Sequence, residues 1–453
     1  MKKRATLGSR WGAVLVAAGS AVGLGNIWRF PYVAGENGGG IFLLLYIGCI
    51  LLLGLPILLA EFSIGRQTRK NAVGAFRAIS KRWSFIGYLN VLAPFLILGF
   101  YFVVAGWTLE YLVVSVTGGI GKYADPETNA QLFQSFTLDP FKPVFYTVLF
   151  VFATHLIIDL GVQKGIERSA KLLMPLLFGV LVILALRSVT MENGLEGLKF
   201  VFRPDFSKVT ASTLLNAMGQ AFFSLSIGLG CMVTYASYFK PETSLRRTAL
   251  HVIVLDTLVA ILASAVIFPA VYSVDGLEPT AGPSLVFETL PVIFNTMNLT
   301  TFWSSAFFLL LAVAALTSTI SLHEVLTAYI SEEWHVSRKN AARITTLAVA
   351  LLASAASLSI GVWREYTICG RNLFDALDFV TANIFLPAGG CFISIFAGWI
   401  MERKALRDQL SNNGTLRLRM FRLIVLLLKF VCPILLLLIF LYNLGLFGTP
   451  VAA

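Results

Sequence analysis

Charged side chains are scarce in this chain of 453 residues, since Asp, Glu, Lys and Arg together make up only 13% of it. An average soluble domain has about 25% charged residues. Here the hydrophobic residues reach 57%, and the mean hydropathy is +0.80. This composition excludes a soluble domain, a disordered chain and a coiled coil.

Cysteine is also rare, with five residues in the whole chain. Cys49, Cys231, Cys391 and Cys432 lie in apolar runs, and only Cys369 is expected in a loop. The four histidines show no spacing typical of metal ligands. The sequence therefore predicts neither a disulfide framework nor a Cys/His metal site.

Long apolar stretches are abundant. A helix of about 20 apolar residues spans a hydrocarbon core of about 30 Å, and a helix satisfies its own backbone hydrogen bonds there. We therefore predict an all-α polytopic membrane protein with eleven transmembrane helices. The predicted spans are 10–35, 41–64, 85–116, 143–160, 167–187, 212–238, 245–272, 302–331, 341–361, 374–401 and 420–447.

The net charge of +11 would suggest a nucleic-acid partner in a soluble protein, but here the position of the charges decides. Basic residues gather in alternate short connections, which the positive-inside rule places in the cytoplasm. We expect a cytoplasmic N-terminus, an extracellular C-terminus and no nucleic-acid partner. These basic residues are Lys2, Lys3, Arg4, Arg10, Arg66, Arg69, Lys70, Arg77, Lys81, Arg82, Lys164, Arg168, Lys171, Lys240, Arg246, Arg247, Arg338, Lys339, Arg343, Arg403, Lys404, Arg407, Arg417, Arg419 and Arg422.

One tripeptide occurs twice, five spans apart. Gly-Leu-Gly stands at 23–25 in the first span and at 228–230 in the sixth. Glycine in a helix interior costs about 1 kcal/mol relative to alanine, so each site is expected to interrupt its helix. Paired interruptions in two halves of a membrane protein indicate an inverted-repeat transporter with a midplane site. The alternative is a chance tripeptide in a chain with 37 glycines.

The residues around the first tripeptide form a long motif. The chain reads GSAVGLGNIWRFPY at 19–32, followed by Glu36 and Asn37 and then three glycines. This closely resembles the signature of the neurotransmitter:sodium symporters, which transport amino acids and biogenic amines with sodium. The likeness continues in order through Tyr101 and Trp107, FSLS at 223–226, LTS at 316–318, and Asp375 and Asp378.

The resemblance covers almost the whole chain and fits the bacterial branch of the family, without the twelfth span that many members have. It implies a single transmembrane domain, 1–453, with the LeuT-type fold. That fold has two inverted repeats of five helices, here 10–187 and 212–401, plus an extra helix at 420–447. Helices 1 and 6 would be unwound in the middle of the membrane.

The resemblance also implies two sodium sites. Na⁺ favours five or six oxygen ligands, which unwound carbonyls and hydroxyls supply. The first site would use Ala21, Asn26, Ser224 and Asp256, with the substrate carboxylate as a further ligand. The second site would use Gly19, Val22, Ala314, Thr317 and Ser318. Thr317 and Ser318 have an ordinary alternative, which is hydrogen bonding to carbonyls of their own helix.

Asp256 lies inside an apolar run, where a charge costs at least about 3 kcal/mol on insertion scales. Chloride-dependent relatives carry Asn at this place and Ser four residues later, whereas this chain has Asp256 and Ala260. Tyr46, Gln220 and Ser224 match the rest of the chloride site. We therefore expect transport that depends on sodium and not on chloride. The alternative is an aspartate turned toward the cytoplasmic loop.

The implied substrate site would bind a zwitterion with an apolar side chain. Helix N-termini favour anions, so Tyr101 with the amides of Leu24 and Gly25 would meet the carboxylate. Positions 20 and 21 carry no Asp, unlike those of amine transporters, which favours amino acids over monoamines. The other substrate-binding residues would be Ala21, Ile97, Phe223, Ser224, Ser226, Leu229, Ser318 and Leu322. Taken singly, the apolar ones have the simpler interpretation of helix packing.

Gates are implied at both ends of the site. Outside, Arg29 and Asp378 would approach each other over the substrate, with Phe223 as a lid. Inside, Arg4 would pair with Glu332, supported by Tyr238. This inner gate departs from the family pattern, because the usual partner is Asp and the usual Trp near Arg4 is Leu7 here.

Two further features concern helix geometry. Gly165 and Pro175 flank the cytoplasmic end of the fifth span, and unwinding there would release sodium inward. A static proline kink is the alternative. Glu61 in the second span is expected to bond the broken backbone of spans 1 and 6.

The expected activity is inward symport of hydrophobic aliphatic and aromatic L-amino acids with two Na⁺, by alternating access in the cell membrane. Its partners are the amino acid and the lipid bilayer, with no obligate protein partner evident. Three alternatives stay open: a proton-coupled exchanger that uses Asp256 or Glu61, a membrane enzyme with Ser226 as nucleophile, and a receptor or channel.

Overall fold

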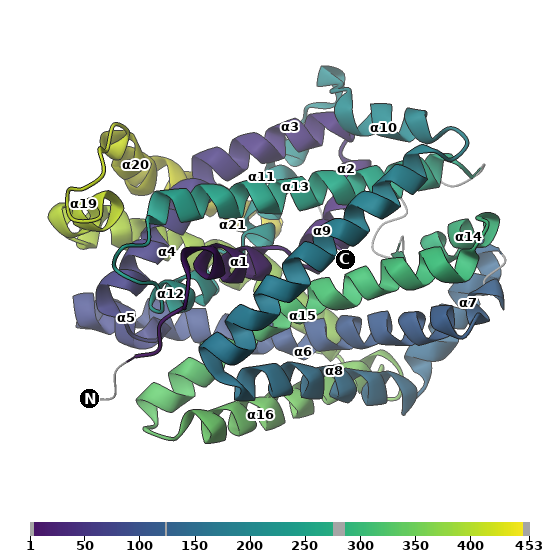
Figure 1. Cartoon of the computed structure of the whole chain (residues 1–453), viewed down its shortest axis with the longest axis horizontal. Coiled ribbons are helices and arrows are strands. Elements are labelled where there is room, and N and C mark those ends of the chain that lie inside the picture. Colours follow the sequence, from purple (N-terminus) through teal and green to yellow (C-terminus); the bar gives the residue numbers. More distant parts are fainter. Residues whose placement is uncertain (1–3, 123–124, 275–285, 447–453) are drawn as a thin grey trace.

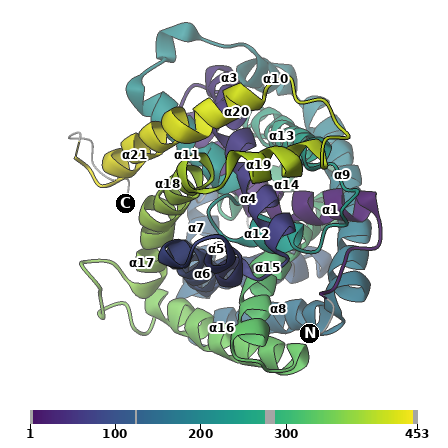
Figure 2. The same ribbon diagram turned by 90° about the vertical axis from the view of Figure 1, so that its left-hand side faces the viewer.

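The structure is a computed structural model that describes residues 4–122, 125–274 and 286–446. Within these ranges the chain is helical and contains no β-strand beyond one isolated bridge between Ile368 and Arg371. Figure 1 shows the helices side by side along the longest axis, and Figure 2 shows the same bundle end-on. The predicted all-α class is confirmed.

The α-helices, joined by short π and 3₁₀ segments (η), have these bounds. They are α1 Arg10–Ala21, η1 Gly25–Arg29, α2 Phe30–Glu36, α3 Gly40–Cys49, η2 Ile50–Gly54, α4 Leu55–Thr68, α5 Ala72–Ile79, η3 Lys81–Trp83, α6 Ser84–Val116, η4 Gly119–Lys122, α7 Pro126–Leu138, α8 Lys142–Asp159, η5 Val162–Glu167, α9 Arg168–Val189, α10 Gly194–Phe202, η6 Phe206–Lys208, α11 Ala211–Ser224, α12 Cys231–Ala236, α13 Leu245–Tyr272, α14 Thr289–Thr296, α15 Thr300–Glu333, α16 Arg338–Ile360, α17 Leu373–Val380, η8 Thr381–Phe385, α18 Leu386–Ile395, η9 Phe396–Ile400, α19 Arg403–Ser411, α20 Phe421–Leu426, η10 Leu427–Val431 and α21 Cys432–Asn443.

Nine helices of the described chain are long and apolar enough to cross a membrane, or ten when a bent pair counts as one span. The bent pair joins α1 to the η1 and α2 segment at an angle of 52°. The predicted span 212–238 is divided between α11 and α12, which are 14 and 6 residues long and too short to qualify. The last residue of the predicted span 420–447, the C-terminal tail, Lys2 and Lys3 lie outside the described residues.

The two Gly-Leu-Gly sites contain glycine for different reasons. At the first site the need is space: a Cβ on Gly23 would lie 2.2 Å from the Ser318 hydroxyl, and one on Gly25 would lie 2.8 Å from the Phe223 ring. At the second site the need is conformation, because Gly228 and Gly230 have φ of +81° and +68°. L-residues rarely adopt such values.

Burial separates inner helices from outer ones. In α6 and α15, 78% of the most apolar 18-residue stretch is buried inside the protein, against 33% in α8 and α16. The α6 and α15 helices pack against each other at the centre. The outer helices present apolar side chains such as Phe152 and Leu351 at the surface. In a membrane protein this surface faces lipid.

Five short helices lie in segments that the sequence predicts as connections, and each is well below the spanning length. Figure 1 shows α5 and α19 at the same end as the N-terminus, and α7, α10 and α14 at the opposite end. Arg77 on α5 and Arg403 on α19 belong to the basic connections. The basic connections on these two helices therefore share one end of the molecule with the N-terminus.

The break between α11 and α12 makes a prediction about stability. Gly228→Ala should destabilise the protein by about 1–2 kcal/mol, because an L-residue is strained at φ +81°. The matched control is Gly219→Ala in α11, where a Cβ meets no atom within 4 Å and alanine favours the helix. Thermal unfolding in detergent checks the pair. Equal stability of the two variants would contradict the requirement for glycine at the break.

Candidate functional site

A small cavity of about 40 Å³ lies between the interruptions of the first and sixth predicted spans. Nine of the predicted substrate-binding residues line it: Ala21, Gly25, Ile97, Tyr101, Phe223, Ser226, Leu229, Ser318 and Leu322. Leu24 and Ser224 were predicted but do not line it. Ser20, Gly23 and Leu386 line it without having been predicted. The cavity thus combines an apolar wall with a few polar groups.

The polar pole of the cavity is formed at the start of η1. The Leu24 amide donates to the Tyr101 hydroxyl oxygen at 3.1 Å, and the Gly23 amide donates to Asn26 Oδ1 at 3.2 Å. From here η1 and α2 run on to Glu36. Amides at such a helix start, together with the Tyr101 hydroxyl, are suited to a carboxylate ligand.

Asp256 on α13 is fully buried and accepts three side-chain hydrogen bonds. Asn26 Nδ2 donates to its Oδ1 at 2.8 Å, Tyr46 Oη to its Oδ2 at 2.9 Å, and Ser224 Oγ to its Oδ2 at 3.1 Å. The predicted Asn26, Ser224 and Asp256 are therefore together, and the carboxylate does not face a loop. One amide nitrogen and two hydroxyl oxygens, from three separate elements, converge on this carboxylate.

A second oxygen cluster joins α15 to the end of α1. Thr317 Oγ1 donates to the Ala314 carbonyl at 2.9 Å and lies 3.2 Å from the Val22 carbonyl oxygen. Ser318 Oγ lies 3.5 Å from the same Val22 oxygen. Gly19 is adjacent, since a Cβ there would lie 3.6 Å from the Thr317 Cβ. Thr317 therefore bonds within its own helix and also reaches across to the interrupted one.

Two buried polar side chains form hydrogen bonds with the backbone at the break between α11 and α12. The Gly228 amide donates to Glu61 Oε1 at 2.8 Å. The Asn90 side chain, with its nitrogen turned toward the break, donates to the Gly228 carbonyl at 2.9 Å. Glu61 was expected to bond the broken backbone of both spans, and the contact found is with the sixth.

On the side of the cavity toward α2, Arg29 contacts an aromatic ring. Its guanidinium carbon lies 4.6 Å from the centre of the Phe223 ring, and Nη1 donates to Gln220 Oε1 at 3.3 Å. The ion pairs of the described residues do not include one between Arg29 and Asp378. The two residues predicted as an outer gate are thus not bridged, because Arg29 is held by Phe223 and Gln220.

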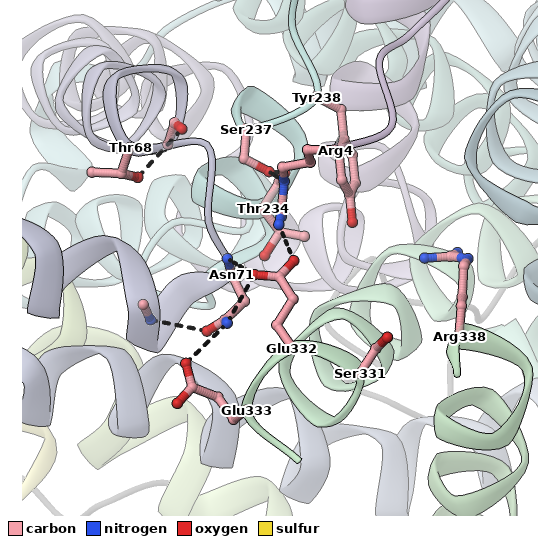
Figure 3. A network of polar contacts seen from close by, with 12 residues as sticks. Arg4, Thr68, Asn71, Thr234, Ser237, Tyr238, Ser331, Glu332, Glu333 and Arg338 are labelled. Carbon is pink, nitrogen blue, oxygen red and sulfur yellow. Dashed lines mark hydrogen bonds and ion pairs between the residues drawn. The ribbon is translucent and has the colours of Figure 1, made fainter. Parts of the chain in front are cut away.

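At the opposite end Arg4 pairs with Glu332, as Figure 3 shows. The Arg4 guanidinium also lies 4.7 Å from the Tyr238 ring centre, and its Nε donates to Ser237 Oγ at 2.9 Å. Burial lowers the pKa of Arg4, while the nearby Tyr238 phenol and Glu324 carboxyl oppose that shift. Arginine stays charged despite such shifts.

The carboxylates around this pair bind further partners. The Asn71 backbone amide donates to Glu332 Oε2 at 2.9 Å. Glu324, which is fully buried, accepts from Tyr238 Oη at 2.7 Å and forms a salt bridge with Arg338 at 2.6 Å. The three residues predicted as an inner gate therefore belong to one network that joins the N-terminal segment, α15 and α16.

Comparison with known proteins decides the family. Residues 4–124 and 141–451 match the sodium:neurotransmitter symporter family. The chain belongs to the sodium:neurotransmitter symporter family. An uncharacterized sodium-dependent transporter of Haemophilus influenzae is 37% identical over 98% of this chain and 99% of its own. One named YhdH from Bacillus subtilis is 37% identical over 96% and 97%.

A solved structure agrees with this assignment. The crystal structure of MhsT in complex with L-phenylalanine is 46% identical in sequence and has a TM-score of 0.88. The match covers 97% of this chain and 99% of that one. The resemblance seen in the motifs is thereby confirmed. This symporter is a multi-pass membrane protein that couples transport to sodium, and it is not an enzyme.

The geometry of Ser226 agrees with the exclusion of an enzyme. Its hydroxyl donates to the Ser20 carbonyl at 2.8 Å, and its φ is 51°. A nucleophilic serine needs a base within hydrogen-bond reach, whereas the Ser226 hydroxyl donates to a backbone carbonyl, which is not a base. In this symporter Ser226 links the two interruptions to each other.

The segment predicted as a hinge is helical in this symporter. Gly165 lies in η5, where a Cβ would be 2.0 Å from the Ile157 carbonyl oxygen, and Pro175 lies inside α9. The unwinding expected between them is absent from this structure.

The inner network gives a prediction about access. Glu332→Gln keeps the shape of the side chain and removes the charge that faces Arg4. A pair worth about 1 kcal/mol changes a population roughly fivefold. In a variant whose only cysteine is Cys231, at the start of α12, we expect about fivefold faster labelling by an impermeant thiol reagent added on the N-terminal side.

The matched control for this experiment is Glu196→Gln. Glu196 pairs with Lys199 at an exposed site of α10, at the opposite end of the molecule, and its loss should leave labelling unchanged. Labelling that stays at the starting rate in Glu332→Gln would mean that the pair does not hold the inner side closed.

Proposed function

We propose that this chain carries hydrophobic L-amino acids, aliphatic and aromatic, into the cell with two Na⁺ per substrate and without chloride. The observation that carries the proposal is the cavity between the two interruptions, which has amides and Tyr101 at one pole and an apolar wall at the other. The structural relative MhsT, solved with L-phenylalanine, supports an amino acid of this kind.

Two oxygen clusters support two sodium ions as cargo. The first groups Asn26, Ser224 and Asp256 with the Ala21 carbonyl and the substrate carboxylate as proposed ligands. In the second, the carbonyls of Gly19, Val22 and Ala314 would join the hydroxyls of Thr317 and Ser318. Hard cations prefer such oxygen sets.

The contacts of Asp256 support independence from chloride. Its carboxylate accepts hydrogen bonds from Asn26, Tyr46 and Ser224. These donors therefore already have an anionic acceptor, and a bound chloride is not needed to accept from them. Ala260, one turn further along α13, carries no hydroxyl. A fixed negative charge beside the first sodium site makes a second anion unnecessary.

Two ions supply enough free energy for concentrative uptake. A tenfold sodium gradient supplies about 1.4 kcal/mol per ion, and 100 mV adds about 2.3 kcal/mol per charge. Two ions therefore supply roughly 7 kcal/mol, enough to concentrate a neutral zwitterion by about five decades. One ion would supply less than three decades.

Alternating access would use the LeuT-type architecture expected from the sequence, with inverted repeats at 10–187 and 212–401 and an eleventh helix near 420–447. Helices 1 and 6 would stay unwound at their interruptions, with the N-terminus cytoplasmic and the C-terminus extracellular. Arg4, Tyr238 and Glu332 would form the inner gate. The outer gate would close when Arg29 leaves Gln220 and reaches Asp378, and unwinding between Gly165 and Pro175 would release sodium inward.

Uptake into proteoliposomes tests the proposal. We expect radiolabelled L-phenylalanine and L-leucine to accumulate against a gradient when sodium is outside, and equally well when gluconate replaces chloride. Dopamine should not accumulate. Uptake that collapses without chloride, or that a proton gradient drives in the absence of sodium, would contradict the proposal.

Asp256 provides a sharper test of the charge. Asp256→Asn removes the negative charge of a proposed sodium ligand. Because interactions with a charged group are worth about 1.5–3 kcal/mol, we expect sodium affinity to fall by roughly 10- to 100-fold. Part of the loss should be recovered by chloride. The matched control is Asp159→Asn at the end of α8. Asp159 is partly exposed and does not line the cavity. Unchanged sodium affinity in Asp256→Asn would exclude the proposed first site.

A further inference from the structure

One wall of the cavity comes from α18, a helix that supplied none of the predicted substrate-binding residues. Leu386 is the first residue of α18, is only 3% exposed, and lines the cavity. The other lining residues come from the first, third, sixth and eighth predicted spans. Leu386 is therefore the contribution of the tenth predicted span to the wall.

Two glycines bring α18 unusually close to the cavity. Residues 386, 389 and 390 share one face of the helix, being three and four positions apart. A Cβ on Gly389 would lie 2.8 Å from the Gly228 carbonyl oxygen, and one on Gly390 would lie 2.3 Å from the Phe222 ring. The helix thus touches the backbone of the break between α11 and α12 directly.

The contact is mutual. A Cβ on Gly228 would lie 3.0 Å from the Gly390 amide and 3.1 Å from the Leu386 carbonyl oxygen. Between Gly228 and the start of α18 the neighbouring atoms are backbone atoms, and the Phe222 ring packs beside them against Gly390. The position of Leu386 relative to the cavity is consequently fixed by backbone against backbone, which is more rigid than a contact between flexible side chains.

We propose that Leu386 is a specificity-determining residue that limits the size of the substrate side chain. The inference rests on the proposed function and deepens it. With α18 held at Gly389 and Gly390, Leu386 belongs to the same apolar lining as Ile97 and Leu322. A wall that cannot retreat rejects a longer side chain, whereas a compliant wall would repack around it.

Variants of different size test the proposal. Leu386→Ala should raise the ratio of kcat/KM for L-tryptophan over L-leucine by about tenfold or more, since one methylene in an apolar pocket changes discrimination by roughly 10- to 200-fold. Leu386→Phe should lower the ratio in the same range. The sodium dependence of uptake should stay as in the wild type in both.

Ile393→Ala is the matched control, because Ile393 is buried on the same helix and does not line the cavity. It should change uptake of both substrates by one common factor. Leu386→Met, which keeps the volume, should retain the wild-type ratio. If a variant is too unstable for uptake, the ratio of dissociation constants for the two amino acids in sodium replaces the kinetic ratio.

The outcomes separate this inference from the proposed function. If Leu386→Ala and Leu386→Phe both keep the wild-type ratio, Leu386 only packs and the inference is wrong, whatever the substrate. If the wild type shows no sodium-dependent uptake of any amino acid, the proposed function itself fails. Opposite changes of the ratio in the two variants, with Ile393→Ala unchanged, would support the inference.

Discussion

Backbone amides and carbonyls without partners are costly inside a membrane, and this constraint governs the centre of the molecule. Interrupting two helices there exposes such groups, and buried side chains from other elements form hydrogen bonds with them. Glu61 and Asn90 bind the amide and carbonyl of Gly228, while Gln220 Nε2 donates to the Gly25 carbonyl at 2.8 Å. The Leu24 amide donates a hydrogen bond to the Tyr101 hydroxyl oxygen. The interruptions are therefore stable features around which a site can be built.

The two ends of the cavity are held by different forces. At the N-terminal end, an ion pair between Arg4 and Glu332 lies in a network of amides and carboxylates. At the other end Arg29 contacts the Phe223 ring and the neutral amide of Gln220 and forms no salt bridge with Asp378 in the described part of the chain. Each contact is modest in energy, which suits a protein that must open each side in turn.

Much of this arrangement could be predicted from the sequence. Hydropathy predicted the bounds of α13, 245–272, because the apolar length needed to cross a bilayer is a strict requirement. Motif positions placed Asn26, Ser224 and Asp256 within reach of one another. Short helices such as α5 and α7 were not predicted, because they are amphipathic or polar and are shorter than a membrane span. The place of Leu386 in the cavity wall was not predicted either. It depends on how closely two backbones approach each other, and a leucine in an apolar run gives no indication of such an approach. The contacts of Arg29 with Phe223 and Gln220 could not be predicted either, because a motif specifies which residues can pair and not which conformation is adopted.

The central claim is that the oxygens gathered at the two interruptions hold cations together with an amino acid. Equilibrium binding of L-phenylalanine to the purified protein, titrated with sodium at constant ionic strength against choline, tests it most directly. The account predicts no measurable binding in choline and a sigmoidal rise with sodium, with a Hill coefficient near two. Binding that is equally tight in choline and in sodium would contradict it.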